Sequence, residues 1–201
     1  MFSKRIPVAA CLILFLGASL TAAQQQKPMS QQEKDMMAQM MKYANPTKAH
    51  DFLKTYVGKF DVEVKQYEKP GSQAMVSKGT MTGELIYGGR FAVCHFEGQM
   101  METPFQGMQL MGYDLFQNKY VGLWIDSMGT AFYHTMGSLD AMGKVLTETG
   151  MWPNPMTGGS DKVKIVTTIM SPGKYRWQMF RPGPDGKDYM AMELLYTKKM
   201  M

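Results

Sequence analysis

Two polar residues inside apolar, aromatic-rich runs are spaced so that they could do chemistry together. Asp126 and His134 flank the turn signal Ser127-Met128-Gly129 at nearly equal distances, so adjacent antiparallel strands could make them neighbours. A carboxylate that orients an imidazole can serve acid–base catalysis or metal ligation. The alternative is an aspartate that caps the turn and a strand histidine that faces solvent.

Charged residues in three further strands are candidates for holding the charge of a ligand. Arg90, Arg181 and Glu193 each interrupt an apolar run, and Arg181 shares one face of its strand with Trp177. A charge that points into a barrel must be paired or must hold a ligand's charge, because desolvating it alone is prohibitive. An arginine there suits a carboxylate or phosphate head group. Arg90 has the alternative of anchoring the Gly88-Gly89 turn.

Large aromatic residues in the strands suit either a filled core or the wall of a cavity, and alternation does not separate the two. They are Tyr113, Phe116, Trp124, Tyr133, Trp177 and Tyr196. The sequence has no Gly-rich phosphate loop, no Gly-x-Ser-x-Gly elbow, and no Cys-x-x-Cys or His-Glu-x-x-His pair. We therefore assign no catalytic residue, metal ligand or cofactor. The predicted ligand-binding residues are Arg90, Tyr113, Trp124, Asp126, His134, Trp177, Arg181 and Glu193.

The segment from Met111 to Met136 shows which elements must position these side chains. It contains three apolar runs separated by two short turn signals, which is typical of up-and-down antiparallel strands. The run from Lys119 to Asp126 is apolar on both faces, as expected of a strand that curves around a filled interior. Turn signals every 8–12 residues or so predict a mainly β fold of about ten antiparallel strands, in a barrel or a sandwich. The apolarity of both strand faces favours the barrel. Gly98 to Gly107, with Pro104, is predicted as a long loop.

The N-terminal region has the pattern of an exported protein. Residues 1–23 read as a secretory signal peptide: two basic residues, an apolar stretch too short to span a bilayer, and a Thr-x-Ala site. Residues 24–44 are predicted as a polar linker and a methionine-rich helix that begins with the capping box Ser30/Glu33. A second helix from Pro46 to Gly58 opens the barrel domain, residues 45–201. We expect a periplasmic or secreted protein with no membrane span after cleavage.

The methionine stripe, Met36, Met37, Met40 and Met41, has two interpretations. It is either a soft face that packs on the barrel or on a protein partner, or a set of thioethers that select Cu(I). The formal net charge is +5, which falls to +3 without the two basic residues of the signal peptide, and no basic stripe suggests nucleic-acid binding. Removal of Cys11 with the signal peptide leaves only Cys94, read as a small buried residue.

Several short segments, in order, carry a resemblance to a known family. They are Gly88-Gly89-Arg90-Phe91, Gly112-Tyr113-Asp114, Trp124-Ile125-Asp126-Ser127, Gly137-Ser138-Leu139-Asp140 and Glu193-Leu194-Leu195-Tyr196. From Ala49 to Lys199 the chain resembles a bacterial family known as domain of unknown function 1579. The resemblance implies a calycin-like barrel of the class that includes lipocalins, and it implies no activity.

These observations favour a binding function. The leading expectation is an exported barrel whose lumen holds a small apolar or amphipathic ligand. One alternative is a copper- or haem-binding periplasmic protein that uses the methionine stripe or one of His50, His95 and His134. Others are a small-barrel enzyme built on Asp126, His134 and Arg90, and an interaction protein whose methionine-rich helix docks a partner.

Overall fold

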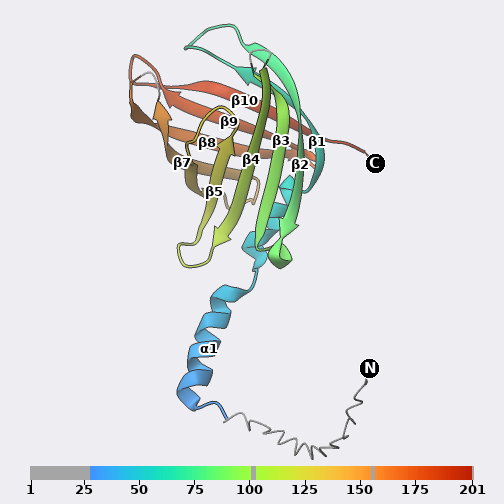
Figure 1. Ribbon diagram of the computed structural model, residues 1–201, viewed down its shortest axis with the longest axis vertical. Coiled ribbons are helices and arrows are strands. Elements are labelled where there is room, and N and C mark those ends of the chain that lie inside the picture. The colour runs from blue at the N-terminus through green and yellow to red at the C-terminus, as the bar shows by residue number, and fades with distance from the viewer. Residues whose placement is uncertain (1–27, 101–102, 155–156, 201) are drawn as a thin grey trace, which may run out of the picture.

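A closed barrel of ten antiparallel strands forms the body of the protein (Figure 1). The computed structural model describes residues 28–100, 103–154 and 157–200. The strands are β1 (Gly58–Gln66), β2 (Met75–Ile86), β3 (Phe91–Met100), β4 (Thr103–Asp114), β5 (Lys119–Asp126), β6 (Tyr133–Leu139), β7 (Val145–Asn154), β8 (Gly159–Ser171), β9 (Lys174–Pro182) and β10 (Asp188–Lys198). Each strand pairs with its neighbours in sequence, and β1 closes the barrel against β10, where Val62 lies opposite Tyr196. The predicted ten-stranded antiparallel barrel is confirmed.

Among the described residues one α-helix precedes the barrel, where two helices were predicted. Helix α1 (Gln31–Ala44) begins at the predicted capping box, in which Ser30 and Glu33 satisfy each other's backbone N–H groups. It projects from one end of the barrel (Figure 1), and its four central methionines are exposed, Met36 by 60% and Met40 by 66%. The interpretation that this stripe packs on the barrel is therefore wrong.

The segment predicted as a second helix is the 3-10 helix η1 (Lys48–Tyr56). Its buried residues are His50, Phe52, Leu53 and Tyr56. Three of them, His50, Leu53 and Tyr56, recur every three positions, which is the repeat of a 3-10 helix. Helix η1 lies against β2, β3 and β4 and covers the end of the barrel from which α1 projects. The Tyr120 hydroxyl donates a hydrogen bond to the Ala49 carbonyl oxygen and ties η1 to β5.

The predicted loop from Gly98 to Gly107 is wrong, because most of it belongs to β3 and β4. Gly98 pairs with Phe105 in this hairpin, and Gln99 pairs with Pro104. Gly107 lies inside β4, and the position requires glycine because the ring of Trp124 occupies the space that a Cβ atom would take. A short helix η2 (Tyr87–Gly89) makes the turn from β2 to β3.

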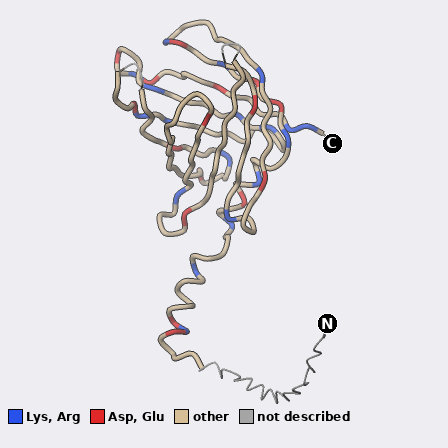
Figure 2. Tube along the Cα trace, viewed as in Figure 1, with Lys and Arg blue, Asp and Glu red and all other residues tan. Residues whose placement is uncertain are grey.

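The end of the barrel under η1 is filled. Phe52, Leu53 and Tyr56 of η1 pack against inward-facing residues of the strands, including Phe60, Leu146 and Tyr175. The rest of the interior is less completely filled and holds the candidate site. Acidic and basic residues are interspersed along the strands (Figure 2). In the described residues we find no helix of sufficient length and hydropathy to cross a membrane.

Candidate functional site

The barrel lumen contains a cavity of about 380 Å³. Its walls are inward-facing side chains of the strands, and it extends toward the strand ends opposite η1, where Met100, Met128 and Pro153 line it. The lining is mostly apolar, with a few polar groups. It comprises Val64, Gln66, Ser77, Phe96, Gln99, Met100, Phe105, Gln109, Gly122, Leu123, Trp124, Asp126, Met128, Tyr133, Thr135, Glu148, Trp152, Pro153, Ile165, Trp177, Met179, Arg181, Met192, Leu194 and Tyr196.

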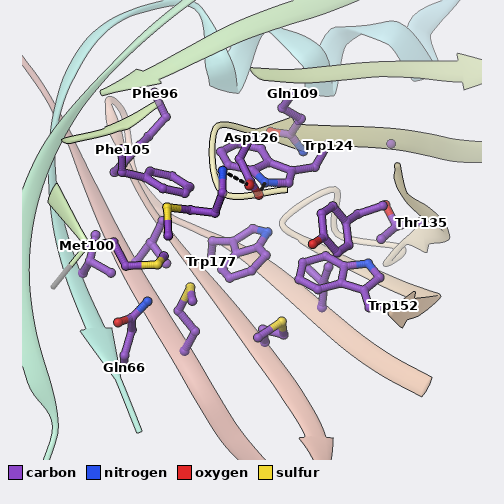
Figure 3. A pocket seen from close by; sticks show the side chains of 18 of the residues that line it. Gln66, Phe96, Met100, Phe105, Gln109, Trp124, Asp126, Thr135, Trp152 and Trp177 are labelled. Atoms are coloured by element: carbon purple, nitrogen blue, oxygen red, sulfur yellow. Dashed lines mark hydrogen bonds between the residues drawn. The ribbon is translucent and has the colours of Figure 1, made fainter. Parts of the chain in front are cut away.

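All three tryptophans of the chain line this cavity. Figure 3 shows Trp124, Trp152 and Trp177 around one space, with Phe105 and Met100 beside them. The Trp124 Nε1–H donates to Asp126 Oδ2 at 2.8 Å, which fixes the orientation of that indole. The buried Trp152 Nε1–H has no hydrogen-bond partner among the described residues. The lumen therefore offers aromatic faces, and the wall around it contains one buried indole N–H without an acceptor among the described residues.

Glu148 is a carboxyl group buried in the cavity wall, and it is not among the residues predicted from the sequence. It is only 1% exposed, and the Thr135 hydroxyl donates to its Oε1 at 2.8 Å. Burial raises the pKa of Glu148 to about 7, and the hydrogen bond from Thr135 opposes that shift. Gly122 makes room for the pair, because a Cβ there would lie 2.6 Å from Thr135 Oγ1. Strand alternation in the sequence could have indicated that Glu148 faces inward, since it lies on the same face of β7 as Leu146.

Arg181 and Asp126, two of the predicted residues, also line the cavity. Arg181 faces inward, as its alternation with Trp177 predicted, and its Nη2 lies 2.7 Å from Asp161 Oδ2. The Asn154 amide donates to the same Asp161 oxygen. Both hydrogen bonds lower the pKa of Asp161, and the one from Asn154 has the larger effect. Asp126 Oδ1 accepts from the Met128 N–H at 3.0 Å in the turn after β5. Both predicted charged residues therefore have protein partners.

The predicted Asp126–His134 pair is wrong. His134 pairs in register with Leu123, whereas Tyr133 lies opposite Trp124. Residues on one strand alternate between faces, so Asp126 points into the lumen with Trp124 while His134 is exposed on the outer surface. The enzyme hypothesis built on this pair loses its geometric basis.

Three more of the predicted residues do not line the cavity. Arg90 donates from Nε to the Ala44 carbonyl and from Nη1 to the Tyr87 carbonyl, both at 2.8 Å, which joins the end of α1 to η2. Tyr113 lies near η1, with its ring 4.9 Å from that of Tyr120. Glu193 is part of the outer face of β10, where it accepts from the Gln178 amide at 2.9 Å and lies 3.8 Å from Lys65 Nζ.

Metal ligation has little support in the described part of the chain. No three His, Cys, Asp or Glu side chains there are grouped as they would be around an ion. None of the three histidines lines the lumen, and His50 instead accepts from the Thr47 N–H at 3.0 Å. Cys94 is buried, as predicted, and burial raises its pKa to about 12. The Cu(I) interpretation of the exposed methionine stripe on α1 stays a prediction.

Comparisons with known proteins place the chain in a family. Residues 45–198 match the family described as "Protein of unknown function (DUF1579)". The chain belongs to this family. The match confirms the resemblance seen in the sequence, and it covers η1 and all ten strands but not α1.

The comparisons also include solved structures of similar fold. No curated protein matched the sequence. The solved structure of the S-type phycobiliprotein lyase CPES from Guillardia theta is similar, with a TM-score of 0.53, 8% identity, and coverage of 80% of this chain and 97% of that chain. A redesigned beta barrel matches with a TM-score of 0.39, 12% identity, and coverage of 74% and 95%. The likeness to the lyase shows the barrel fold alone.

Proposed function

We propose that the protein binds a small, largely apolar or amphipathic molecule in the lumen of its barrel. The observation that carries this proposal is the cavity of about 380 Å³ walled by all three tryptophans of the chain. Binding sites for small molecules are concave, mostly apolar, and of about 300–1,000 Å³. A void this large in a core that served only for stability would lose packing energy without compensation.

The fold and the lining give two kinds of support. The similar solved barrel is named a phycobiliprotein lyase, which supports a binding role at the level of fold analogy. In the lining, apolar side chains surround a few polar groups, as in sites where burial gives affinity and hydrogen bonds give orientation. A ligand that buries about 300 Å² of apolar surface gains about 7 kcal/mol before the costs of association. Probe concentrations from micromolar to millimolar are therefore appropriate.

We also propose that the binding protein is exported. The support is the sequence pattern of residues 1–23, which lie outside the described residues, followed by the polar linker and helix of residues 24–44 and the barrel domain of residues 45–201. N-terminal sequencing of the protein from fractionated cells tests this. A chain that keeps residues 1–23 and stays in the cytoplasm contradicts export and leaves the lumen proposal untouched.

A matched pair of variants tests binding in the lumen. Ser77 lines the cavity, and Thr80 lies on the same strand with its side chain exposed. Ser77→Phe places a ring in the cavity, whereas Thr80→Phe adds the same ring outside. We expect Ser77→Phe to abolish, and Thr80→Phe to preserve, both the recovery of an organic-extractable molecule by mass spectrometry and the binding of 4-phenylbutanol.

Binding is followed by the fluorescence of the three lumen tryptophans, and circular dichroism confirms that each variant is folded. Equal recovery of the molecule, or equal probe binding, from both folded variants contradicts the proposal. A folded parent protein that yields no extractable molecule and leaves its fluorescence unchanged with millimolar 4-phenylbutanol contradicts it as well.

A further inference from the structure

The lumen has a charge that the chain as a whole does not share. The protein carries a formal net charge of +5, yet the carboxyl groups of Asp126 and Glu148 both line the cavity. Arg181 is the only Lys or Arg in the described lining, and Asp161, which is not part of that lining, lies 2.7 Å from it. The cavity therefore has an excess of acid with no lining cation left to balance it.

Glu148 is the carboxyl group for which this imbalance matters most. Asp126 accepts two hydrogen bonds at the strand end, whereas Glu148 is 99% removed from solvent and accepts one, from Thr135. Within the described part of the chain, Glu148 Oε2 has no hydrogen bond and no ion-pair partner. A buried carboxylate without a cation is costly, and burial accordingly raises the pKa of Glu148 to about 7. A cation in the lumen would lower that cost.

The walls of the cavity that includes this carboxyl suit an organic cation. The faces of tryptophan and tyrosine rings attract ammonium groups, and the attraction grows when the site excludes water. Trp124, Trp152, Trp177 and Tyr196 all contribute to the lining. Aromatic rings together with one buried carboxylate are the combination that recognises amines and quaternary ammonium ions.

We infer that the lumen ligand is an organic amine or ammonium ion, with its cationic group paired to the carboxylate of Glu148 and its apolar part against the tryptophans. This inference rests on the proposed function and specifies its ligand class. Thr135 holds Glu148 in place through Oε1, which leaves Oε2 for the ligand. An anionic ligand is disfavoured because the lining arginine already has a carboxylate partner.

Three probes of equal carbon skeleton test the inference: 4-phenylbutylamine, 4-phenylbutanol and 4-phenylbutyrate. They are titrated at pH 8, where the amine is cationic and Glu148 is mostly ionised, into the purified protein and its Glu148→Gln variant. Tryptophan fluorescence and calorimetry give the dissociation constants. Glu148→Gln keeps the size of the side chain and its acceptor for Thr135, and Asp126→Asn is the control for the second lining carboxyl.

We expect the protein to bind the amine about tenfold or more tightly than the alcohol, and to bind the carboxylic acid most weakly. Glu148→Gln should bring the amine to the affinity of the alcohol while leaving the alcohol unchanged, and Asp126→Asn should keep most of the preference. Equal binding of amine and alcohol by the parent protein, or a preference that survives Glu148→Gln, overturns the inference but leaves the proposed function standing. Failure of all three probes to bind counts against both.

Discussion

Replacement of Glu148 by glutamine should change the pH dependence of folding stability in a calculable way. The folded protein holds a proton on Glu148 with a pKa of about 7, against an ordinary value of 4.5. Each factor of ten in a protonation constant corresponds to about 1.4 kcal/mol, so full ionisation of this group costs the folded state about 3 kcal/mol. Below pH 4.5 the carboxyl is protonated in both states and the cost is absent. Stability is then lost as the pH rises through about 7.

Glutamine does not titrate, so the variant lacks this loss. We expect the free energy of unfolding of Glu148→Gln, relative to the parent protein, to rise by about 3 kcal/mol between pH 4.5 and pH 8. For a chain of this size that corresponds to a relative gain of about 6–12 °C in Tm. The pKa of Tyr56 lies well above its usual range, mainly because of burial and next because of the charge of Glu148. This neighbouring hydroxyl therefore does not titrate between pH 4.5 and pH 8.

Urea unfolding followed by tryptophan fluorescence at several pH values measures the effect. Any constant cost of the buried amide cancels, because only the change with pH is compared. Glu97→Gln is the control, since Glu97 is exposed on β3, and its profile should run parallel to that of the parent protein. Parallel profiles for the parent protein and Glu148→Gln would refute the argument that this carboxyl is held protonated by burial.

Three further perturbations test the fold around the site. Gly83→Ala should lower the free energy of unfolding in urea by about 1–3 kcal/mol, because the new Cβ would overlap the Tyr56 carbonyl oxygen. Gly129→Ala, in an open turn, is the control and should lower it little. Equal effects of the two substitutions contradict the tight docking of η1. Cys94 should resist iodoacetamide at pH 8 until the protein is unfolded, because burial raises the pKa of its thiol to about 12. Mass spectrometry of labelled peptides measures the reaction, and labelling of the native thiol contradicts the prediction. Arg90→Ala should speed tryptic cleavage in the last turn of α1, since Arg90 donates a hydrogen bond to the final carbonyl of that helix. The Tm of the barrel should stay within about 2 °C of the parent value. Cleavage at an unchanged rate contradicts this anchoring role.

Strand alternation made the barrel predictable. In β5, Tyr120 and Trp124 face the interior together, and the apolar character of both strand faces correctly indicated a curved wall around an apolar interior. The same rule placed Arg181 inside with Trp177. Hairpin turns then fixed the order of the strands, because neighbours in sequence become neighbours in the sheet.

The site was less predictable because its composition depends on contacts between strands. Register decides whether two residues meet: His134 is opposite Leu123, so the equal spacing of Asp126 and His134 about the turn gave the wrong pair. Gly107 was interpreted as part of a loop, although it is a strand residue whose missing side chain admits the Trp124 ring. Glu148 was overlooked because a glutamate in a strand is usually exposed, and only alternation with Leu146 marked it as inward.

The pairing of β1 with β10 has a consequence for how the chain reaches its native state. The first strand finds its second partner only when the last strand has been made, almost the whole length of the domain later. Until then β1 and β9 each present an unsaturated edge of backbone N–H and C=O groups, to which other extended chains can add. Nascent or prematurely terminated chains that lack residues 188–198 should therefore self-associate, whereas the complete ring has no free edge to recruit a neighbour.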